Sequence, residues 1–246
     1  MAFSLFKKRK SGEVTLELGD NEFCTFWEEK ADDVTADFSV SANSDHYNLL
    51  YRDGRYLGIP QFYGGDIYPF SDDPTKKGSN REKKKYKRAK IVCISKGTHL
   101  KLSWGTPHPF KIHDPATGKM YEVGANGVLY ININTADAAT NANLFYETVL
   151  SQGNKDYYNT ENLAEFLRDA FLNHIGAKIE DYIHATGKPL SNFVGLTSSE
   201  ILTVSKEICP ALADIFDDYG VTIVQKASAG SVIKGFIVKE ITPRNF

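Results

Sequence analysis

The sequence predicts an α+β protein in which a mixed, mostly antiparallel sheet packs against two to three helices near the C-terminal half. Three observations favour this fold class. Short alternating or β-branched apolar runs dominate the first and middle parts of the chain, helical periodicity begins near residue 159, and two apolar runs close the chain. Strands that are grouped apart from helices are typical of α+β folds.

The first strands are predicted from alternation and from one turn. Residues 34–40 alternate apolar and polar side chains, which indicates a half-buried strand. Asp53-Gly54 lies between two runs rich in Tyr and Leu, and this dipeptide favours a tight hairpin. Residues 62–80 are dense in Gly, Pro, Asp and Ser, so we expect a loop there.

The middle of the chain predicts several further strands and one turn. Asp114 to Gly118 consists of turn-forming residues. Gly124 and Gly127 interrupt a long apolar run, which indicates a bulge or bend within a strand. Strands are expected at 89–95, 99–104, 110–114 and 120–133.

Two helices are predicted in the last part. Apolar residues recur at three- and four-residue spacing from Leu163 to Ile183, so an amphipathic helix should run from 159 to about 187. A capping box at Thr197–Glu200 should begin a second helix that ends near Gly220. Pro210 should kink or divide this helix. Strands are expected at 221–228 and 231–242.

Composition excludes several classes of protein. The 246 residues carry a net charge of −2, so the whole chain gives no nucleic-acid signal. Three scattered cysteines argue against a disulfide framework, and their apolar neighbours indicate buried structural thiols. No apolar run approaches the length of a transmembrane helix. Residues 1–19 are interpreted as a tail or peripheral anchor, and residues 20–246 as a single domain with a basic loop at 76–90.

The basic loop is the most highly charged segment, with nine basic residues and one acidic residue. A solvated surface loop is the favoured interpretation, and contact with an anionic surface is the second. Tyr86 is the single aromatic side chain in the loop, which makes nucleic acid the less favoured anionic partner. The candidate anion-binding residues are Lys76, Lys77, Arg81, Lys83, Lys84, Lys85, Lys87 and Arg88.

Residues 99–131 hold the densest group of potential ligands. His99, His108 and His113 lack the short spacings of common zinc sites, and His113 and Asp114 should point to opposite faces of a strand. The chain carries no GxSxG, P-loop or GxGxxG motif. We therefore expect no metal, no cofactor and no catalytic residues, and Trp104 should cover a core. An enzyme with a dispersed site around Trp104, His108 and His113 remains the weaker alternative.

Several motifs together resemble the SPFH superfamily, the stomatin, prohibitin, flotillin or band-7 domains. Trp104-Gly105-Thr106 with Pro107 and the Asp114-Pro115 turn resembles its soluble bacterial, virion-core-like branch. Similar features are Trp27-Glu28-Glu29, the Asp53-Gly54 hairpin, and a helix that runs into Tyr219-Gly220. The last strand ends in Ile241-Thr242-Pro243. The resemblance covers most of residues 20–243.

The resemblance implies a non-enzymatic scaffold that self-associates and organises partners. SPFH domains form rings or large oligomers, usually on a membrane face, and bring no catalytic residues to carry over. We therefore expect a homo-oligomeric, cytoplasmic, bacterial protein, with peripheral attachment to an anionic inner-membrane face as a further expectation. The alternative is binding of anionic lipid or nucleic acid through residues 76–90.

Overall fold

The computed structural model describes residues 7–8, 13–19, 22–30, 38–70, 86–96, 100–106, 108–151, 159–224 and 235–244. The chain forms two compact units, each built from two segments. Unit 1 contains residues 1–98 and 133–160, and unit 2 contains residues 99–132 and 161–246. The sequence analysis expected one domain over 20–246. The chain passes between the units more than once, so the division does not correspond to a single linker in the sequence.

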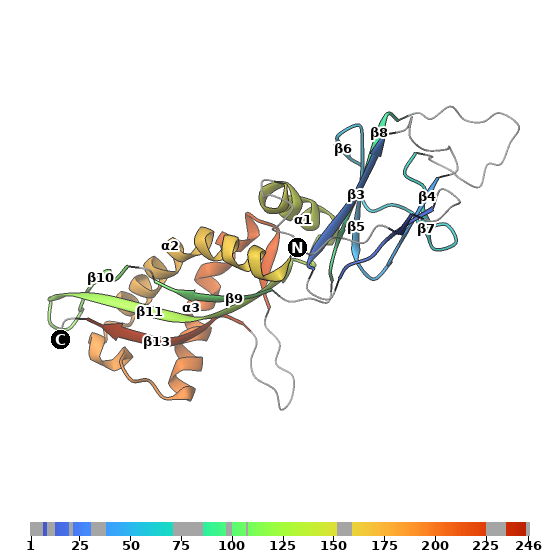
Figure 1. Cartoon of the computed structure of the whole chain (residues 1–246). Helices are drawn as coiled ribbons and strands as arrows, with labels where there is room; N and C mark the ends of the chain where they lie inside the picture. The colour runs from blue at the N-terminus through green and yellow to red at the C-terminus, as the bar shows by residue number, and fades with distance from the viewer. Residues whose placement is uncertain are drawn as a thin grey trace, which may run out of the picture. The chain divides into compact units, whose positions relative to one another are not determined.

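Unit 1 contains two four-stranded sheets (Figure 1). The first has the order β1-β2-β4-β7, in which β2 and β4 pair in parallel. The second has the order β3-β8-β5-β6, and its strands pair antiparallel. The bounds are β1 Lys7–Lys8, β2 Glu13–Leu16, β3 Cys24–Lys30, β4 Ser39–Ala42, β5 Tyr47–Arg52, β6 Arg55–Tyr56, β7 Asp66–Ile67 and β8 Arg88–Ile94.

The core of unit 1 lies between its two sheets. One apolar cluster includes Leu16 and Val40 from the first sheet and Trp27, Leu50 and Ile91 from the second. The other face of the second sheet is covered by helical residues, because the rings of Phe23 and Phe145 meet edge to face at 5.8 Å. All six residues of β5 are buried, as expected for a strand that is covered on both faces.

The helical cover of unit 1 was not predicted. Helix α1 spans Ala138–Phe145 and continues as a π-helix, η2, over Tyr146–Leu150. The Asp137 carboxylate caps α1 by accepting a hydrogen bond from the Thr140 N–H. Only Ala142 and Phe145 of α1 are buried, so the apolar pattern is too short to reveal a helix.

The N-terminal segment also differs from the expectation. Residues 13–16, which were predicted to belong to a tail, form β2 in the first sheet. Val14 and Leu16 are buried there. The pairing is parallel to β4, and a parallel partner lies far away in sequence, so no local turn signals it. Of the predicted strand at 34–40, residues 39–40 belong to β4, Ser39–Ala42, and residue 38 precedes it. Residues 31–37 lie outside the described part.

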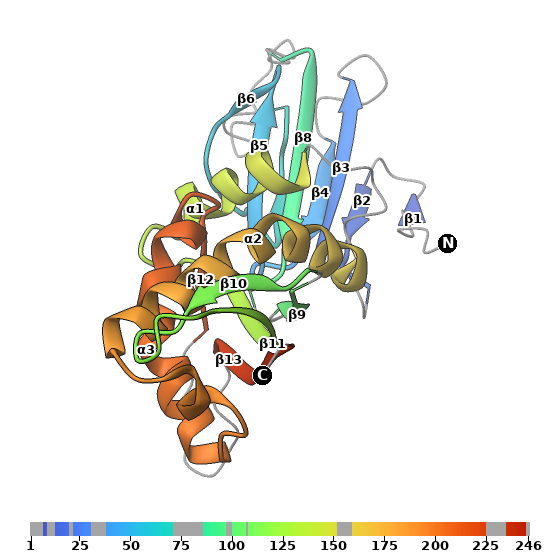
Figure 2. The ribbon, with the colours of Figure 1, turned by 90° about the vertical axis from the view of Figure 1, so that its left-hand side faces the viewer.

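Unit 2 is built around the 14-residue strand β11 (Figure 2). β9 and β10 pair with one edge of β11, and β13 pairs with the other. Gly127 faces Trp104 on one side and Val238 on the other, which fixes β11 as the central strand. The bounds are β9 Leu100–Gly105, β10 Phe110–His113, β11 Met120–Ile133, β12 Val221–Ile223 and β13 Ile237–Pro243.

The helices of unit 2 follow the sequence prediction closely. Helix α2 spans Thr160–Thr186, a 3-10 turn η4 spans Leu190–Phe193, and α3 spans Ser198–Asp217. The predicted capping box is present, because Thr197 and Glu200 bond each other's backbone N–H groups. Pro210 was expected to kink or divide this helix, and it does not divide it, since α3 runs continuously through this exposed residue. The α+β fold class is confirmed.

Candidate functional site

The Trp104–Thr106 segment ends β9 and joins it to the central strand of unit 2. Trp104 is 4% exposed, and its ring stacks on Phe236 with centroids 5.4 Å apart. The Thr106 hydroxyl accepts a hydrogen bond from the Ala125 N–H at 3.1 Å, and the Thr106 N–H donates to the Ala125 carbonyl at 2.9 Å. The motif residues therefore build the sheet, as the sequence analysis expected for Trp104.

Gly127 explains why this tryptophan can lie so close to the sheet. A Cβ atom at position 127 would lie 2.5 Å from Cζ2 of Trp104 and 1.9 Å from the carbonyl oxygen of Ile237. The ring thus rests directly on the backbone of β11. The pairing of β11 with β13 shifts register between Asn126 and Gly127 and passes over Lys239 of β13, so the predicted irregularity is found at Gly127, whereas Gly124 pairs regularly with Thr242. The close approach of the ring could not be predicted, because it depends on strands that are distant in sequence.

The three residues of the alternative enzyme site do not form a recorded contact with one another. Trp104 is buried, whereas His108 and His113 are exposed. His113 instead stacks on His184 of α2, with ring centroids 6.4 Å apart and planes 19° apart. His99 lies outside the described residues. The sequence analysis did not pair His113 with His184, because one belongs to a strand and the other to a distant helix.

The paired histidines were tested as a metal site. The Nε2 atom of His184 lies 3.9 Å from a carboxylate oxygen of Glu180, so a third potential ligand is near. An imidazole binds a metal through a lone pair in the plane of its ring, and two nearly parallel rings do not aim their lone pairs at one point. Among the described residues, no group of three or more potential ligands could hold a metal ion.

Asp114 serves a turn. Its Oδ1 accepts a hydrogen bond from the Ala116 N–H at 2.9 Å, and its Oδ2 accepts one from the Thr117 hydroxyl at 3.0 Å. These bonds, led by that from Ala116, lower the pKa of the Asp114 carboxyl. The carboxylate closes the predicted Asp114–Gly118 turn, because the Gly118 N–H also donates to the Asp114 carbonyl at 2.9 Å.

All three cysteines are buried and none forms a disulfide, which confirms the prediction that they are buried. Burial raises the pKa of the Cys24 thiol well above its ordinary value, and nearby Cys93 adds to the effect. Burial also raises the pKa of Cys93 to about 12. A thiol with a raised pKa is a poor nucleophile near neutral pH.

The predicted anion-binding residues fall mostly outside the described part of the chain. Residues 71–85 are not described, and they include Lys76, Lys77, Arg81, Lys83, Lys84 and Lys85. Lys87 and Arg88 are described, and both are exposed. The Asp53 carboxylate accepts hydrogen bonds from their backbone N–H groups, each at 2.9 Å. The predicted Asp-Gly hairpin is confirmed. Its Asp53 carboxylate is hydrogen-bonded to the backbone at the start of β8.

Arg52 contacts residues on both sides of the undescribed residues 71–85. Its Nε donates to the Pro69 carbonyl at 2.6 Å, and its Nη2 donates to the Tyr68 carbonyl at 3.3 Å. Its guanidinium also lies over the Tyr86 ring, 4.4 Å from the centroid. Residues 68–69 and 86 are therefore held by one buried side chain. Sequence reasoning missed this role, because a lone arginine beside a hairpin gives no signal of its distant partners.

A pocket of about 270 Å³ lies on the other face of the same sheet. Lys90 lies at its wall between two rings, with Nζ 4.6 Å from the centroid of Phe26 and 5.1 Å from that of Tyr146. Glu28 lies 3.8 Å from the same Nζ. The lysine charge is therefore already partnered within the protein.

The hydroxyl groups of this pocket are neutral. The Tyr51 hydroxyl donates to the Asn143 side-chain oxygen at 2.6 Å, and burial raises the pKa of both Tyr51 and Tyr146 far above the ordinary value. Glu147 belongs to the π-helix η2, and single π-helical turns occur frequently at functional sites. This combination suits the binding of a polar group better than proton transfer near neutral pH.

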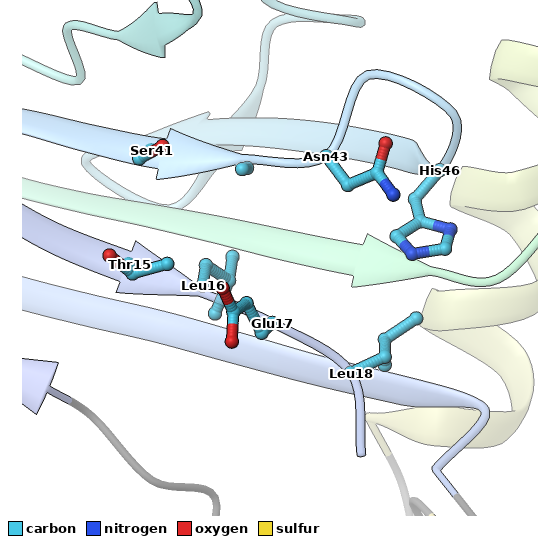
Figure 3. Close-up of a pocket in the computed structure, with 8 residues that line it drawn as sticks. Thr15, Leu16, Glu17, Leu18, Ser41, Asn43 and His46 are labelled. Carbon is cyan, nitrogen blue, oxygen red and sulfur yellow. The ribbon is translucent and has the colours of Figure 1, made fainter. Parts of the chain in front are cut away.

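A larger pocket of about 410 Å³ lies where the parallel strands β2 and β4 end (Figure 3). Its polar side chains come from Thr15, Glu17, Ser41, Asn43 and His46. Burial lowers the pKa of His46, and the charge of Lys96 lowers it further. Among the described residues, Nδ1 of His46 is buried without a hydrogen-bond partner.

Comparison of the chain with protein-family models finds no match, and comparison with curated proteins finds none. None of the described helices combines the length and apolar character needed to cross a bilayer.

Proposed function

We propose that the protein is a non-enzymatic scaffold that self-associates and organises partners, as the resemblance to SPFH domains implies. The observation that carries this proposal is the use of the motif residues within the fold. Trp104 and Thr106 tie β9 to β11, and Asp114 closes a turn. Residues that resemble a family motif thus serve architecture, which supports a function in binding.

The sheet of unit 2 offers a way to self-associate. β9 and β13 flank β11 on opposite sides, and each pairs only with β11 within the described residues. The edge of each strand that faces away from β11 presents backbone N–H and C=O groups that can pair with another chain. Both strands run antiparallel to β11, so they run in the same direction.

Opposite edges of one sheet make a head-to-tail interface. When the β13 edge of one copy meets the β9 edge of the next, the same contact is repeated at each step. Such an interface closes into a ring or continues as a filament. Lys101 on β9 and Glu240 on β13 are exposed on the same face of the sheet, because both lie opposite even-numbered residues of β11. Their opposite charges favour contact between the β13 edge of one copy and the β9 edge of the next.

Size-exclusion chromatography with light scattering tests self-association. We expect an oligomer whose population rises with protein concentration. A strict monomer over a wide concentration range would contradict the proposal.

A charge exchange tests the edge contact itself. The single variants Lys101→Glu and Glu240→Lys should each weaken association about fivefold, because they place like charges together. The double variant should restore it. Lys206→Glu is the matched control, since Lys206 is an exposed lysine on α3, away from both strand edges. Equal effects of all three single variants would argue against a β9–β13 interface.

A further inference from the structure

One row of side chains crosses three strands of the second sheet of unit 1. Glu28 on β3 and Tyr51 on β5 each lie directly opposite Lys90 of β8. Residues that face each other across a ladder point to the same side of the sheet, and Arg88, two residues before Lys90, points to that side as well. All four line the pocket of about 270 Å³. The strand register therefore brings charged groups of both signs and a phenol to one wall of this pocket.

A second wall comes from the helical segment that runs across β5 and β8 (Figure 2). The buried rings of Tyr146, in η2, and Tyr51 pack with centroids 5.4 Å apart. Glu147 and Ser151 lie beside them in the lining. The Ser151 hydroxyl donates a hydrogen bond to the Glu147 carbonyl at 2.7 Å. The pocket thus combines a buried aromatic surface with a carboxylate from a hydrogen-bonded helical turn.

The charges of this pocket are only partly offset within the protein. Glu28 and Lys90 lie 3.8 Å apart and offset each other. Within the described part of the chain, no ion pair is recorded for the remaining charged residues of the lining, Arg88, Asp53 and Glu147. Oδ1 of Asp53 accepts two backbone N–H groups, and no partner of its Oδ2 is recorded among the described residues. A ligand with two positive groups and one negative group would match these three side chains.

Ligands that carry one sign of charge fit this pocket poorly. A phosphate or a dicarboxylate would meet three carboxylates. A simple diamine would meet the guanidinium of Arg88 and the ammonium of Lys90. A metal ion is disfavoured too, because the described residues include no group of three or more potential ligands that could hold one. A small zwitterion satisfies both signs.

We propose that this pocket binds a free α-amino acid with a cationic side chain, of the lysine or arginine class. The Arg88 guanidinium binds the carboxylate of the ligand, for which its planar fork is suited. The carboxylates of Asp53 and Glu147 bind the α-ammonium group and the side-chain cation. The methylene groups of the ligand pack on the tyrosine rings. A pocket at the lower end of the usual size range for ligand sites suits a molecule this small.

A free amino acid fits the pocket better than the C-terminal residue of a peptide. Only the free molecule carries the α-ammonium group, so a peptide that ends in lysine would leave one of the two carboxylates without a partner. The inference goes beyond the proposed scaffold function, because it assigns a ligand to unit 1, whereas the proposed contact between copies uses strands of unit 2. Ligand binding and self-association can therefore fail separately.

Isothermal titration calorimetry of the full chain at low salt tests the proposal. We expect L-lysine and L-arginine to bind, and L-glutamate not to bind. Three probes each lack one charge of lysine: cadaverine lacks the carboxylate, L-norleucine lacks the side-chain ammonium, and Nα-acetyl-L-lysine lacks the α-ammonium. Each should bind roughly tenfold more weakly than lysine, or worse. Absence of binding by both basic amino acids, or equal affinity for lysine and any of the three probes, overturns the proposal.

Three variants assign the contacts. Arg88→Gln should lower the affinity for lysine to that for cadaverine, because it removes the partner of the carboxylate, and Glu147→Gln should weaken lysine binding roughly tenfold. Both residues are exposed, so neither change should prevent folding. Lys30→Gln is the matched control, since Lys30 lies directly opposite Arg88 in the β3–β8 ladder but does not line the pocket. This control should bind lysine as the native chain does, and a loss equal to that of Arg88→Gln would overturn the assigned contact.

Discussion

The two tryptophans form similar aromatic pairs, but their other neighbours differ. In unit 1, Trp27 stacks on Phe38 with centroids 5.2 Å apart, inside a cluster of side chains from two sheets. In unit 2, Trp104 stacks on Phe236 at 5.4 Å and also lies against the backbone at Gly127. Side chains can repack around a changed neighbour, whereas a strand backbone has little freedom to move. Unit 2 should therefore be the more sensitive unit.

The largest expected effect is that of Gly127→Ala. The added Cβ would lie 1.9 Å from the Ile237 carbonyl oxygen, so β11 and β13 must separate. We expect a loss of about 4 kcal/mol or more in the free energy of unfolding, or failure to fold. Chemical denaturation in a Trp27→Phe background measures unit 2, because Trp104 is then the only tryptophan.

Gly124→Ala is the matched control within the same strand. Its added Cβ would lie 3.8 Å from the nearest atoms, which is ordinary contact. We expect a change within about 0.5 kcal/mol. Equal losses at both glycines would show that β11 needs glycine for flexibility and that the close approach of Trp104 is not the cause.

Ser205→Ala should have the next largest effect, and it tests a second specific contact in unit 2. The buried Ser205 hydroxyl accepts a hydrogen bond from the Val238 N–H at 2.9 Å and so holds β13 against α3. Removal leaves a buried backbone donor without its partner, which costs about 1–3 kcal/mol. Thr203→Ala is the control, because Thr203 is an exposed hydroxyl on the same helix. Equal unfolding midpoints for Ser205→Ala and Thr203→Ala would show that the Ser205–Val238 hydrogen bond adds no measurable stability.

The sequence revealed the elements whose signals are local. The stripe from Leu163 to Ile183 predicted α2, Thr197 and Glu200 predicted the start of α3, and Asp53-Gly54 predicted its hairpin. Each signal lies within one continuous segment of the sequence. Helix α1 and strand β2 were missed because one buries only two side chains and the other pairs in parallel with a distant strand.

The candidate surfaces were less predictable, because they depend on neighbours from distant strands. Arg88 was named from the charge of its segment, but Glu28 and Tyr51 join it in one pocket only through the register of β3, β8 and β5. His113 was expected to be apart from other histidines, and the fold places it against His184.

Trp27→Phe should cost less than either change in unit 2. Phe38 and Phe70 both contact the Trp27 ring, at 5.2 Å and 6.2 Å between centroids, and a smaller ring can repack against them. We expect a loss of about 1 kcal/mol. Fluorescence cannot follow unit 1 in this variant, so circular dichroism during denaturation measures the change. A loss of unfolding free energy comparable to that of Gly127→Ala would show that unit 1 is as sensitive to substitution as unit 2.

The smallest expected effect is a pH-dependent one at the Asp114 turn. Hydrogen bonds from Ala116 and Thr117 lower the pKa of the Asp114 carboxyl in the folded state. The ionised carboxylate therefore stabilises unit 2 above the unfolded pKa of about 3.9, and this stabilisation is lost as pH falls through the lower folded pKa. Asp114→Asn should be less stable than the native chain at pH 7.

The stability difference between Asp114→Asn and the native chain should shrink as pH falls below about 3.9, because the native carboxyl then takes up its proton. Thermal unfolding of both chains between pH 7 and pH 3 measures this convergence. The Thr117→Val variant is the control, because it removes the Thr117 hydroxyl from the hydrogen bonds that the carboxylate accepts and should show the same convergence with a smaller amplitude. A difference that stays constant with pH would mean that Asp114 acts through the shape of the turn and that its charge contributes nothing.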